Sequence, residues 1–235
     1  MTYDKDAYKC VNFKKIYSKA NELLALAPSI TGFPFKAKTF IYEQSDIKLC
    51  SFKKAKEKYG IHVPMFGSES AVIQVLDGAY IIFYNQNEPD YRVRFSIMHE
   101  FGHYILSHKM NLKESDRLYH TQELEANCFA AQLLMPEQLL RECQKRNKAL
   151  TRDFIMNSFC VSDDAAQKRK HTLANTVAEW RSREESEFDD IILMKYTQIL
   201  NVIAPKPREF SYYDYEDEYA RQRERDSWLD SRTRW

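Results

Sequence analysis

Two histidines four residues apart on one predicted helix constrain this chain more strongly than any other feature. A helical period of apolar residues extends over 91–108, and His99 and His103 lie off its apolar stripe. Residues four apart stack on one helix face, about 6 Å apart along the axis, so two imidazoles can bind one ion. Glu100 lies about 100° further round, where its carboxylate can reach a metal-bound water without binding the metal. The spacing therefore predicts a zinc site of the His-Glu-x-x-His type, with Glu100 as the catalytic base.

An amphipathic helix with incidental histidines would show the same spacing. Gly102 favours the metal site, because glycine inside a helix costs roughly 0.5–1 kcal/mol relative to alanine. A costly residue beside the two histidines indicates that another backbone approaches closely there. Ala126 and Ala130 are small residues that would let a second helix pack against Gly102.

A zinc hydrolase of this kind needs a third protein ligand, and the segment ELEANCFAAQLLMP, residues 123–136, offers one. Glu123 can complete a site of two histidines and one glutamate. Asn127 points to the same side of the helix and can hydrogen-bond a ligand imidazole. Glu125 is a rival ligand, about 200° round the helix from Glu123, so only one of the two can face the metal. Both carboxylates are also favoured at a solvated helix N-terminus.

Other polar residues near these segments carry weaker signals. His108 and His120 flank the candidate site in sequence and can stabilise an oxyanion, but surface positions are the simpler interpretation. Tyr104 and Tyr119 are comparable candidates.

Asp77-Gly78 between two apolar runs is the strongest short hairpin signal in the sequence. Strands concentrate there, with a further short strand over 47–50, and helices occupy the rest, which predicts an α+β domain with a small antiparallel sheet. The run AYIIFYN, residues 79–85, directly precedes the histidine helix. We predict it to be an edge strand on which an extended substrate docks. The predicted substrate-binding residues are Tyr80, Ile82 and Tyr84.

Capping residues predict the bounds of further helices. Ser51 can cap a helix over 52–59, which Gly60 ends. An N-terminal helical period stops at Pro28, and Pro136 can open a helix as its first residue.

The sequence changes character after residue 148, and we predict three parts. Residues 1–148 form the domain with the candidate site, 149–205 a helical extension, and 206–235 a polar, aromatic-rich tail. The extension is predicted as helix, tight turn, helix, with Ser162 or Asp163 as the second N-cap, and so resembles a helix-turn-helix. A DNA-reading helix presents basic side chains from its first turns, whereas this helix begins with two aspartates. We therefore expect the helix pair to pack on the domain and not to bind nucleic acid.

Overall charge and composition exclude other classes. The 235 residues carry a net charge of +1, which gives no overall attraction to nucleic acid or to a membrane. No apolar run approaches the roughly 18 residues of a membrane span, and the start of the sequence lacks the apolar core of a signal peptide. Five scattered cysteines without a C-x-x-C pair predict reduced thiols in a cytoplasmic protein. The tail combines aromatic residues with arginines, as interfaces do, and can mediate self-association or cover the candidate site.

The segments RFSIMHEFGHYILSH and ELEANCFAAQLLMP together resemble the ImmA/IrrE family of zinc metallopeptidases. The family's marks are a HExGH helix and a later glutamate before an A-x-x-FA-x-x-LLMP-like run. The resemblance covers roughly residues 70–140, extends more weakly over 150–175, and implies a zincin-like, thermolysin-like fold. Asn127 stands where thermolysin-like enzymes carry an aspartate. The implied catalytic residue is Glu100, and the implied ligands are His99, His103 and Glu123.

We accordingly predict a zinc metalloendopeptidase with one zinc ion per chain. Zinc lowers the pKa of its water toward about 7, Glu100 takes the proton, and the hydroxide attacks a peptide carbonyl. The resemblance implies a protein substrate, typically a helix-turn-helix repressor, in a bacterial, phage or mobile-element setting. Two alternatives stay open: a zinc-containing module that sequesters a transcriptional regulator without cleaving it, and a DNA-binding regulator that uses residues 151–174. Glu100, which a structural zinc site does not require, argues against the first.

Overall fold

The β-hairpin predicted at Asp77-Gly78 is present in the computed structural model of the chain. Strands β2 (Ala71–Leu76) and β3 (Ala79–Tyr84) pair antiparallel across it. Asp77 and Gly78 have φ angles of 50° and 75°, and two successive positive φ angles form the turn whose twist suits a two-residue hairpin. The structure describes residues 9–62, 68–110, 112–175, 183–206 and 216–225.

The sheet is mixed, and the prediction of an antiparallel sheet is wrong for its third strand. Strand β1 (Lys48–Ser51) runs parallel to β3, in the order β1-β3-β2, with Lys48 opposite Ile81. The chain reaches β3 from β1 through helix α4 (Phe52–Tyr59) and then through β2. The hairpin reverses the chain between β2 and β3, so β3 returns to the direction of β1.

The two faces of the sheet pack on different parts of the molecule. One face forms a small apolar cluster with α4, and the other joins the main core beside helix α5 (Asp90–Ile105). Alternate residues of β3 serve the two faces, as the strand period of two requires. The α4 face includes Ile81 and Phe83, and the core face includes Ile82 and Tyr84.

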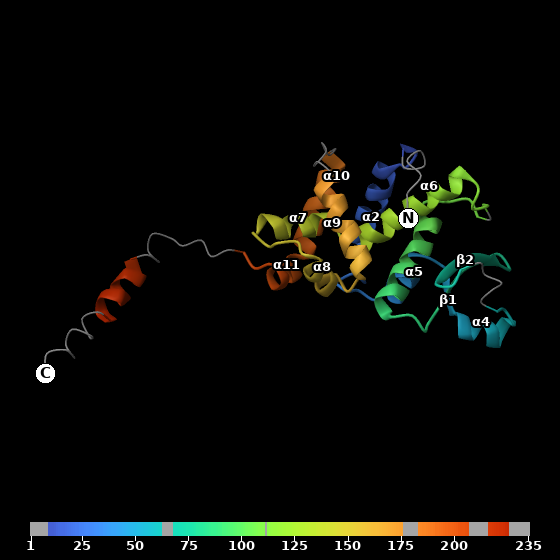
Figure 1. Cartoon of the computed structure of the whole chain (residues 1–235), viewed down its shortest axis with the longest axis horizontal. Helices are drawn as coiled ribbons and strands as arrows, with labels where there is room; N and C mark the ends of the chain where they lie inside the picture. The colour runs from blue at the N-terminus through green and yellow to red at the C-terminus, as the bar shows by residue number, and fades with distance from the viewer. Residues whose placement is uncertain (1–8, 63–67, 111, 176–182, 207–215, 226–235) are drawn as a thin grey trace. The chain divides into compact units, whose positions relative to one another are not determined.

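Helices α5 and α6 (Arg117–Leu134) approach each other closely at Gly102. A Cβ atom on Gly102 would lie 3.0 Å from Cδ1 of Phe129 and 3.3 Å from Cα of Ala126. The close approach predicted from this glycine is therefore confirmed, and Ala126 supplies the approaching backbone. Helix α2 (Phe13–Leu26) also packs on α6, so α6 lies between α2 and α5 (Figure 1).

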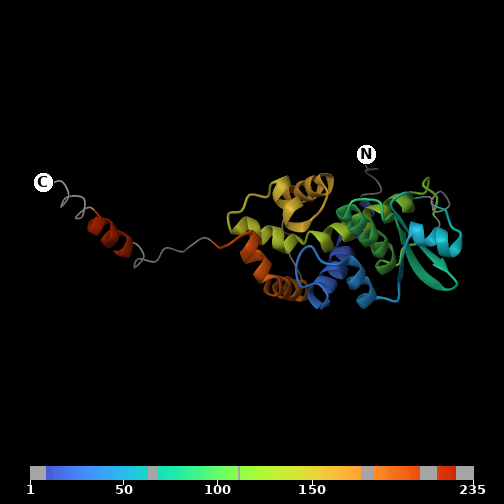
Figure 2. The same cartoon turned by 90° about the horizontal axis from the view of Figure 1, so that it is seen from below.

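The helices after α6 pack in the same compact unit, which ends at Ala204. Figure 2 shows α8 and α9 on one side of α6 and α7, and α10 on the opposite side with α2. The boundary predicted at residue 148 falls inside this unit, and residues from Pro205 onward belong to a second one. The bounds are α7 (Glu137–Lys145), α8 (Arg152–Phe159), α9 (Asp163–Asn175), α10 (Arg183–Lys195) and α11 (Thr197–Ile203).

Local capping chemistry explains the helix bounds that agree with the sequence. The Oγ of Ser51 accepts a hydrogen bond from the Lys54 backbone N–H, and Gly60 ends α4 with a φ of 66°. The predictions of both caps are confirmed. Ser162 caps α9, because its Oγ accepts from the Ala165 N–H at 3.2 Å.

Other bounds differ from the prediction. Helix α3 (Ala37–Gln44) was not predicted, because it has no side-chain cap at its start and is only 8 residues long. Pro136 is the N-cap of α7 and not its first residue. Tyr196 separates α10 from α11, and its buried hydroxyl donates to the Leu24 carbonyl at 2.8 Å.

The predicted tail lies largely outside the described residues. This applies to the acidic, tyrosine-rich stretch 209–215 and to Trp228 and Trp235, while residues 216–225 are helical. Self-association through the tail and cover of the candidate site by the tail therefore stay predictions.

The contact at Gly102 gives a first testable prediction. Alanine is the better helix former by about 1 kcal/mol, but its methyl group would press on the Ala126 backbone and the Phe129 ring. Overpacking of this kind costs roughly 1–3 kcal/mol. We expect Gly102→Ala to lower the melting temperature of the metal-free protein in a thermal unfolding experiment.

Gly32→Ala is the control, because a Cβ on Gly32 would meet nothing within 4 Å. It should leave the melting temperature nearly unchanged. A Gly102→Ala protein as stable as the original would show that α5 and α6 can separate without loss.

Candidate metal centre

Three side chains from two helices converge beside the sheet. The Nε2 atoms of His99 and His103, both on α5, lie 3.1 Å apart. Glu123 of α6 places one carboxylate oxygen 3.2 Å from Nε2 of His99 and the other 3.3 Å from Nε2 of His103. One donor atom from each residue lies within 4.8 Å of the others. The structure thus brings together the three residues that the sequence analysis assigned as ligands.

Hydrogen bonding orients His99 for a metal. Its Nδ1 lies 3.1 Å from Oδ1 of Asn127, one turn after Glu123 on α6. Because an amide oxygen only accepts, Nδ1 carries the proton and donates. The neutral ring then directs the lone pair of Nε2 toward His103 and Glu123. Asn127 therefore lies where the sequence analysis placed it, behind a ligand imidazole.

The separations of the donor atoms match a tetrahedral ion. Donors bound at about 2.0–2.1 Å to a tetrahedral centre lie about 3.3 Å from one another. In this cluster the two Nε2 atoms lie 3.1 Å apart, Oε2 of Glu123 lies 3.2 Å from Nε2 of His99, and Oε1 lies 3.3 Å from Nε2 of His103. Small adjustments of the side chains alone would therefore accommodate a metal, and three protein donors would leave one position open.

The electrostatics of the cluster favour a positive charge between the three side chains. Burial lowers the pKa of His99, but the hydrogen bond with Glu123 and the charges of Glu100 and Glu123 outweigh burial and raise it. Burial raises the pKa of Glu123, but its hydrogen bonds with His103 and His99 dominate and lower it strongly. The carboxylate thus stays ionised and attracts either a proton or a cation to the two imidazoles.

Glu100 lies beside the donor set and outside it. Its Oε2 accepts a hydrogen bond from the Ile73 backbone N–H at 2.8 Å, which links helix α5 to strand β2. Burial raises the pKa of Glu100, and the charges of His99 and His103 oppose this rise. Glu100 was predicted from its place in the helix, whereas Ile73 has no signal in the sequence, because this apolar strand residue contributes through its backbone N–H.

The rival ligand Glu125 does not join the donor set. Its Oε2 lies 3.0 Å from Nε2 of His108, and the Nδ1 of His108 lies 3.0 Å from Nδ1 of His103. Only 4% of the His108 side chain is exposed, so its interpretation as a surface residue is wrong. His120 is exposed, as expected.

Tyr119 lies one helical turn before Glu123 on α6 and is partly exposed. Burial raises its pKa, and the negative charges of Glu123, Glu114 and Glu100 add to the rise. The Tyr119 hydroxyl is therefore close enough to the cluster to be affected by the charges of Glu123 and Glu100.

Strand β3 is not an edge strand, so the predicted docking strand is wrong. It is paired with β1 on one side and with β2 on the other. Of the three residues assigned to substrate binding, Ile82 is fully buried, and the Tyr84 hydroxyl accepts a hydrogen bond from Lys38 at 2.7 Å. Tyr80 is 38% exposed, and its ring packs edge-on against Tyr104 of α5 at 5.0 Å.

The helix-turn-helix-like pair is built into the core of the unit. Arg169 of α9 is 3% exposed and donates to the Met135 carbonyl, to Gln132 and to the Tyr17 hydroxyl. A basic residue of the second helix thus serves packing against α6 and α2, which agrees with the expectation of a structural pair.

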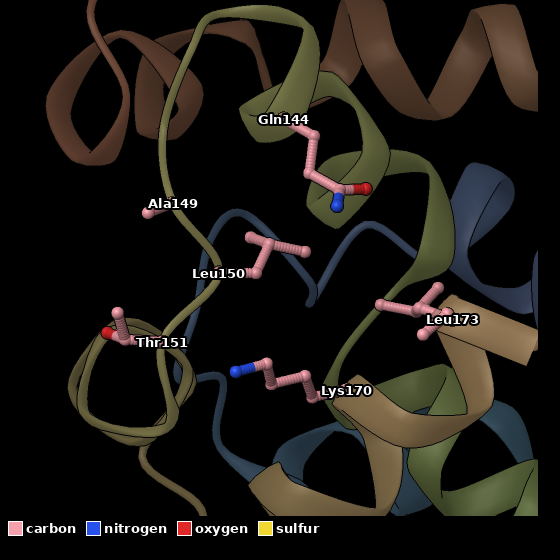
Figure 3. A pocket seen from close by; sticks show the side chains of 7 residues that line it. Gln144, Ala149, Leu150, Thr151, Lys170 and Leu173 are labelled. Carbon is pink, nitrogen blue, oxygen red and sulfur yellow. The ribbon is translucent and has the colours of Figure 1, made fainter.

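A hollow of about 320 Å³ lies beside this pair (Figure 3). Its lining has a single charged side chain, Lys170, and neither a carboxylate nor an imidazole. The lining therefore offers no hydrolytic chemistry. It consists of Gln144, Ala149, Leu150, Thr151, Lys170, Leu173 and Ala174.

In an α+β fold, a cluster of two histidines and one glutamate with a further carboxylate beside it is typical of a metallopeptidase. The model of the Peptidase_M78 family, the IrrE N-terminal-like domain, matches residues 43–171. The chain belongs to this peptidase family, which confirms the resemblance found in its sequence. A comparison with curated proteins gave no match. No helix in the described part of the chain is both long enough and apolar enough to cross a membrane.

The donor set gives a second testable prediction. Removing one of three donors leaves a site that no longer holds a metal stoichiometrically. We expect the purified protein to bind about one zinc ion per chain and His103→Ala to lose it, as measured by elemental analysis.

The matched control is His120→Ala, which removes an exposed histidine from α6. It should retain the metal. Equal metal contents in the two variants would contradict the assignment of His103 as a donor.

Proposed function

We propose that this protein is a zinc-dependent endopeptidase with a zincin-like, thermolysin-like site. One observation carries the proposal: three donors converge from α5 and α6, while a fourth group, Glu100, is held beside them and takes no part in the cluster. Two imidazoles and one carboxylate with an open position are the donor set of catalytic zinc. A bound zinc ion would supply Lewis-acid activation of water and of the peptide carbonyl.

Glu100 is the proposed general base. The Ile73 N–H occupies Oε2 and fixes the carboxylate, which leaves Oε1 to accept a proton from the attacking water. Burial raises the pKa of this carboxyl group and so makes it a stronger base than an exposed glutamate. The same carboxyl group then donates the proton to the leaving amine.

Strand β2 replaces β3 as the proposed docking edge. The Ile73 N–H points to Glu100 and therefore away from β3. Backbone N–H groups along a strand point alternately to its two sides. The N–H groups of Ala71 and Val75, each two residues from Ile73, therefore point to the same outer edge of β2. An extended peptide can add to this edge through main-chain hydrogen bonds, close to Glu100. Val75 is 49% exposed there.

The proposed substrate is a protein, in particular a helix-turn-helix transcriptional regulator, as the family resemblance implies. Recognition by main-chain hydrogen bonds makes little demand on sequence, so selection of the regulator must come from contacts outside the docking edge. A repressor cut in this way would release its genes in a bacterial, phage or mobile-element setting.

The proposed setting is the cytoplasm, and no role in binding nucleic acid is proposed. All five cysteines are unpaired, which is typical of a reducing compartment. The burial of Arg169 removes a basic side chain from the surface of α9, so this helix is poorly suited to read DNA.

Replacement of the base gives a third prediction. Glu100→Gln keeps the shape of the side chain and removes its ability to accept a proton at pH 7. We expect peptide hydrolysis to fall by roughly 10²–10⁴-fold while the zinc content stays at the wild-type level. Hydrolysis rates and elemental analysis of the same preparations check this.

The same variant serves as a trap for the substrate. A regulator that the wild type cleaves should co-purify intact with Glu100→Gln and be found as two fragments after incubation with the wild type, by intact-mass analysis. Undiminished hydrolysis by Glu100→Gln would exclude Glu100 as the base. A wild type that binds the regulator and never cuts it would favour the sequestering module.

The docking edge gives a fourth prediction. Val75→Pro removes an outward N–H without removing a hydrogen bond to β3, and edge strands tolerate proline. One hydrogen bond contributes about 0.5–1.5 kcal/mol, so we expect KM for a long peptide to rise by up to about tenfold at unchanged zinc content. Val75→Ala, which keeps the N–H, is the control and should have a near-normal KM. Equal KM values for the two variants would contradict docking at β2.

A further inference from the structure

A chain of polar contacts extends from the back of His103 to the N-terminal helix. Nδ1 of His103 lies 3.0 Å from Nδ1 of His108, and Nε2 of His108 lies 3.0 Å from Oε2 of Glu125. The other oxygen of Glu125 accepts a hydrogen bond from the Asn12 backbone N–H at 2.9 Å. Asn12 is also the N-cap of α2. None of these contacts belongs to the donor set itself.

The backbone after α5 is shaped to place His108 in this position. Helix α5 ends at Ile105, and Ser107 has a φ of 58°, a left-handed conformation that few residues other than glycine adopt. The chain folds back there, and the His108 N–H donates to the His103 carbonyl at 3.0 Å. Lys15 of α2 donates to the Leu106 carbonyl at 3.1 Å and holds the same loop.

The proton positions along this chain follow from metal binding at His103. A neutral His103 that offers its Nε2 lone pair to a metal carries its proton on Nδ1 and donates it to His108. Nδ1 of His108 then accepts, so the proton of His108 is on Nε2 and is donated to Glu125. Each donor meets one acceptor, and the series ends on a carboxylate that the Asn12 backbone orients.

The two ligand histidines thus have hydrogen-bonding partners of different chemical types. His99 donates to the neutral amide of Asn127, whereas His103 is linked through a second imidazole to the carboxylate of Glu125. The His108 and Glu125 side chains are only 4% and 16% exposed, which limits competition from water. A metal-bound histidine that donates its other N–H to such a group is held in orientation and becomes a better ligand.

We propose that His108 and Glu125 are positioning residues that fix the His103 ring and raise the metal affinity of the site. This inference rests on the proposed metallopeptidase function, since it assumes that His103 is a ligand. It extends the centre beyond its donors to α2, through Asn12. Filling space behind His103 would be a purely structural role, and the two roles predict different behaviour of variants at His108.

The test measures the zinc Kd of full-length protein by competition with a chromophoric chelator. His108→Phe keeps a ring and removes the acceptor for His103, so Kd should rise by roughly 10- to 100-fold, as for lost partners of metal ligands in general. His108→Asn places an amide oxygen near the former Nδ1 position and should recover part of the affinity. Glu125→Gln keeps an acceptor for His108 but removes the charge, and its Kd should lie between that of the wild type and that of His108→Phe.

Two further measurements separate positioning from folding. Melting curves of the metal-free proteins identify any variant that does not fold, and Glu125→Gln and His108→Asn test the inference if His108→Phe is unfolded. The visible spectrum of the cobalt-substituted protein should change in His108→Phe. Without the hydrogen bond to His108 the His103 ring changes its orientation, and this alters the ligand field of the cobalt ion.

The outcomes distinguish this inference from the proposed function. Wild-type protein that binds no zinc would overturn the proposed function and this inference together. Wild-type protein that binds zinc, with folded variants of unchanged Kd and cobalt spectrum, would overturn the inference alone. It would also be overturned if His108→Asn bound zinc no better than a folded His108→Phe, since the acceptor for His103 would then have no effect.

Discussion

The close contact of α5 with α6 at Gly102 and Ala126 is the constraint on which the site depends. Its donors come from both helices, and the 3.2 and 3.3 Å separations between Glu123 and the two imidazoles exist only at this helix spacing. A side chain at residue 102 would meet the Ala126 backbone at 3.3 Å. Glycine at position 102 lowers the helix propensity of α5, but it allows α6 to approach closely enough for Glu123 to reach His99 and His103.

Each polar group of the site is fixed by a different element of the fold. Strand β2 holds Glu100 through the Ile73 N–H, α6 holds His99 through Asn127, and the loop after α5 places His108 behind His103. Buried polar groups need such partners, since each unpaired one costs about 1–3 kcal/mol. A side chain that is already held in place loses little further freedom when it binds a metal or a substrate.

The sequence predicted those elements whose signals are local. The Ser51 and Gly60 caps, the Asp77-Gly78 turn and the period of α5 depend on residues only a few positions apart, and all are found, although α5 ends at Ile105 and not at residue 108. Helix α3 was missed because it is short and has no side-chain cap, so that burial of Ala37, Phe40 and Ile41 stabilises it instead. The parallel pairing of β1 with β3 joins distant segments, for which the sequence has no local signal.

By itself the sequence determined the chemistry of the site: helical geometry sets the faces on which His99, Glu100 and His103 lie, and the Glu123–Asn127 spacing sets those of the second helix. Helical geometry left Glu123 and Glu125 as alternatives and the family resemblance favoured Glu123, whereas in the tertiary structure packing at Gly102 selects the face of α6 that meets α5. The tertiary structure also made β3 the central strand and β2 an outer strand of the sheet formed by the described residues, and it buried His108 behind His103. The physical reason is the sequence separation of the interacting residues. Hydrogen bonds within a helix fix side-chain directions over one turn, whereas strand order and helix contacts depend on how segments far apart in the sequence pack in one core.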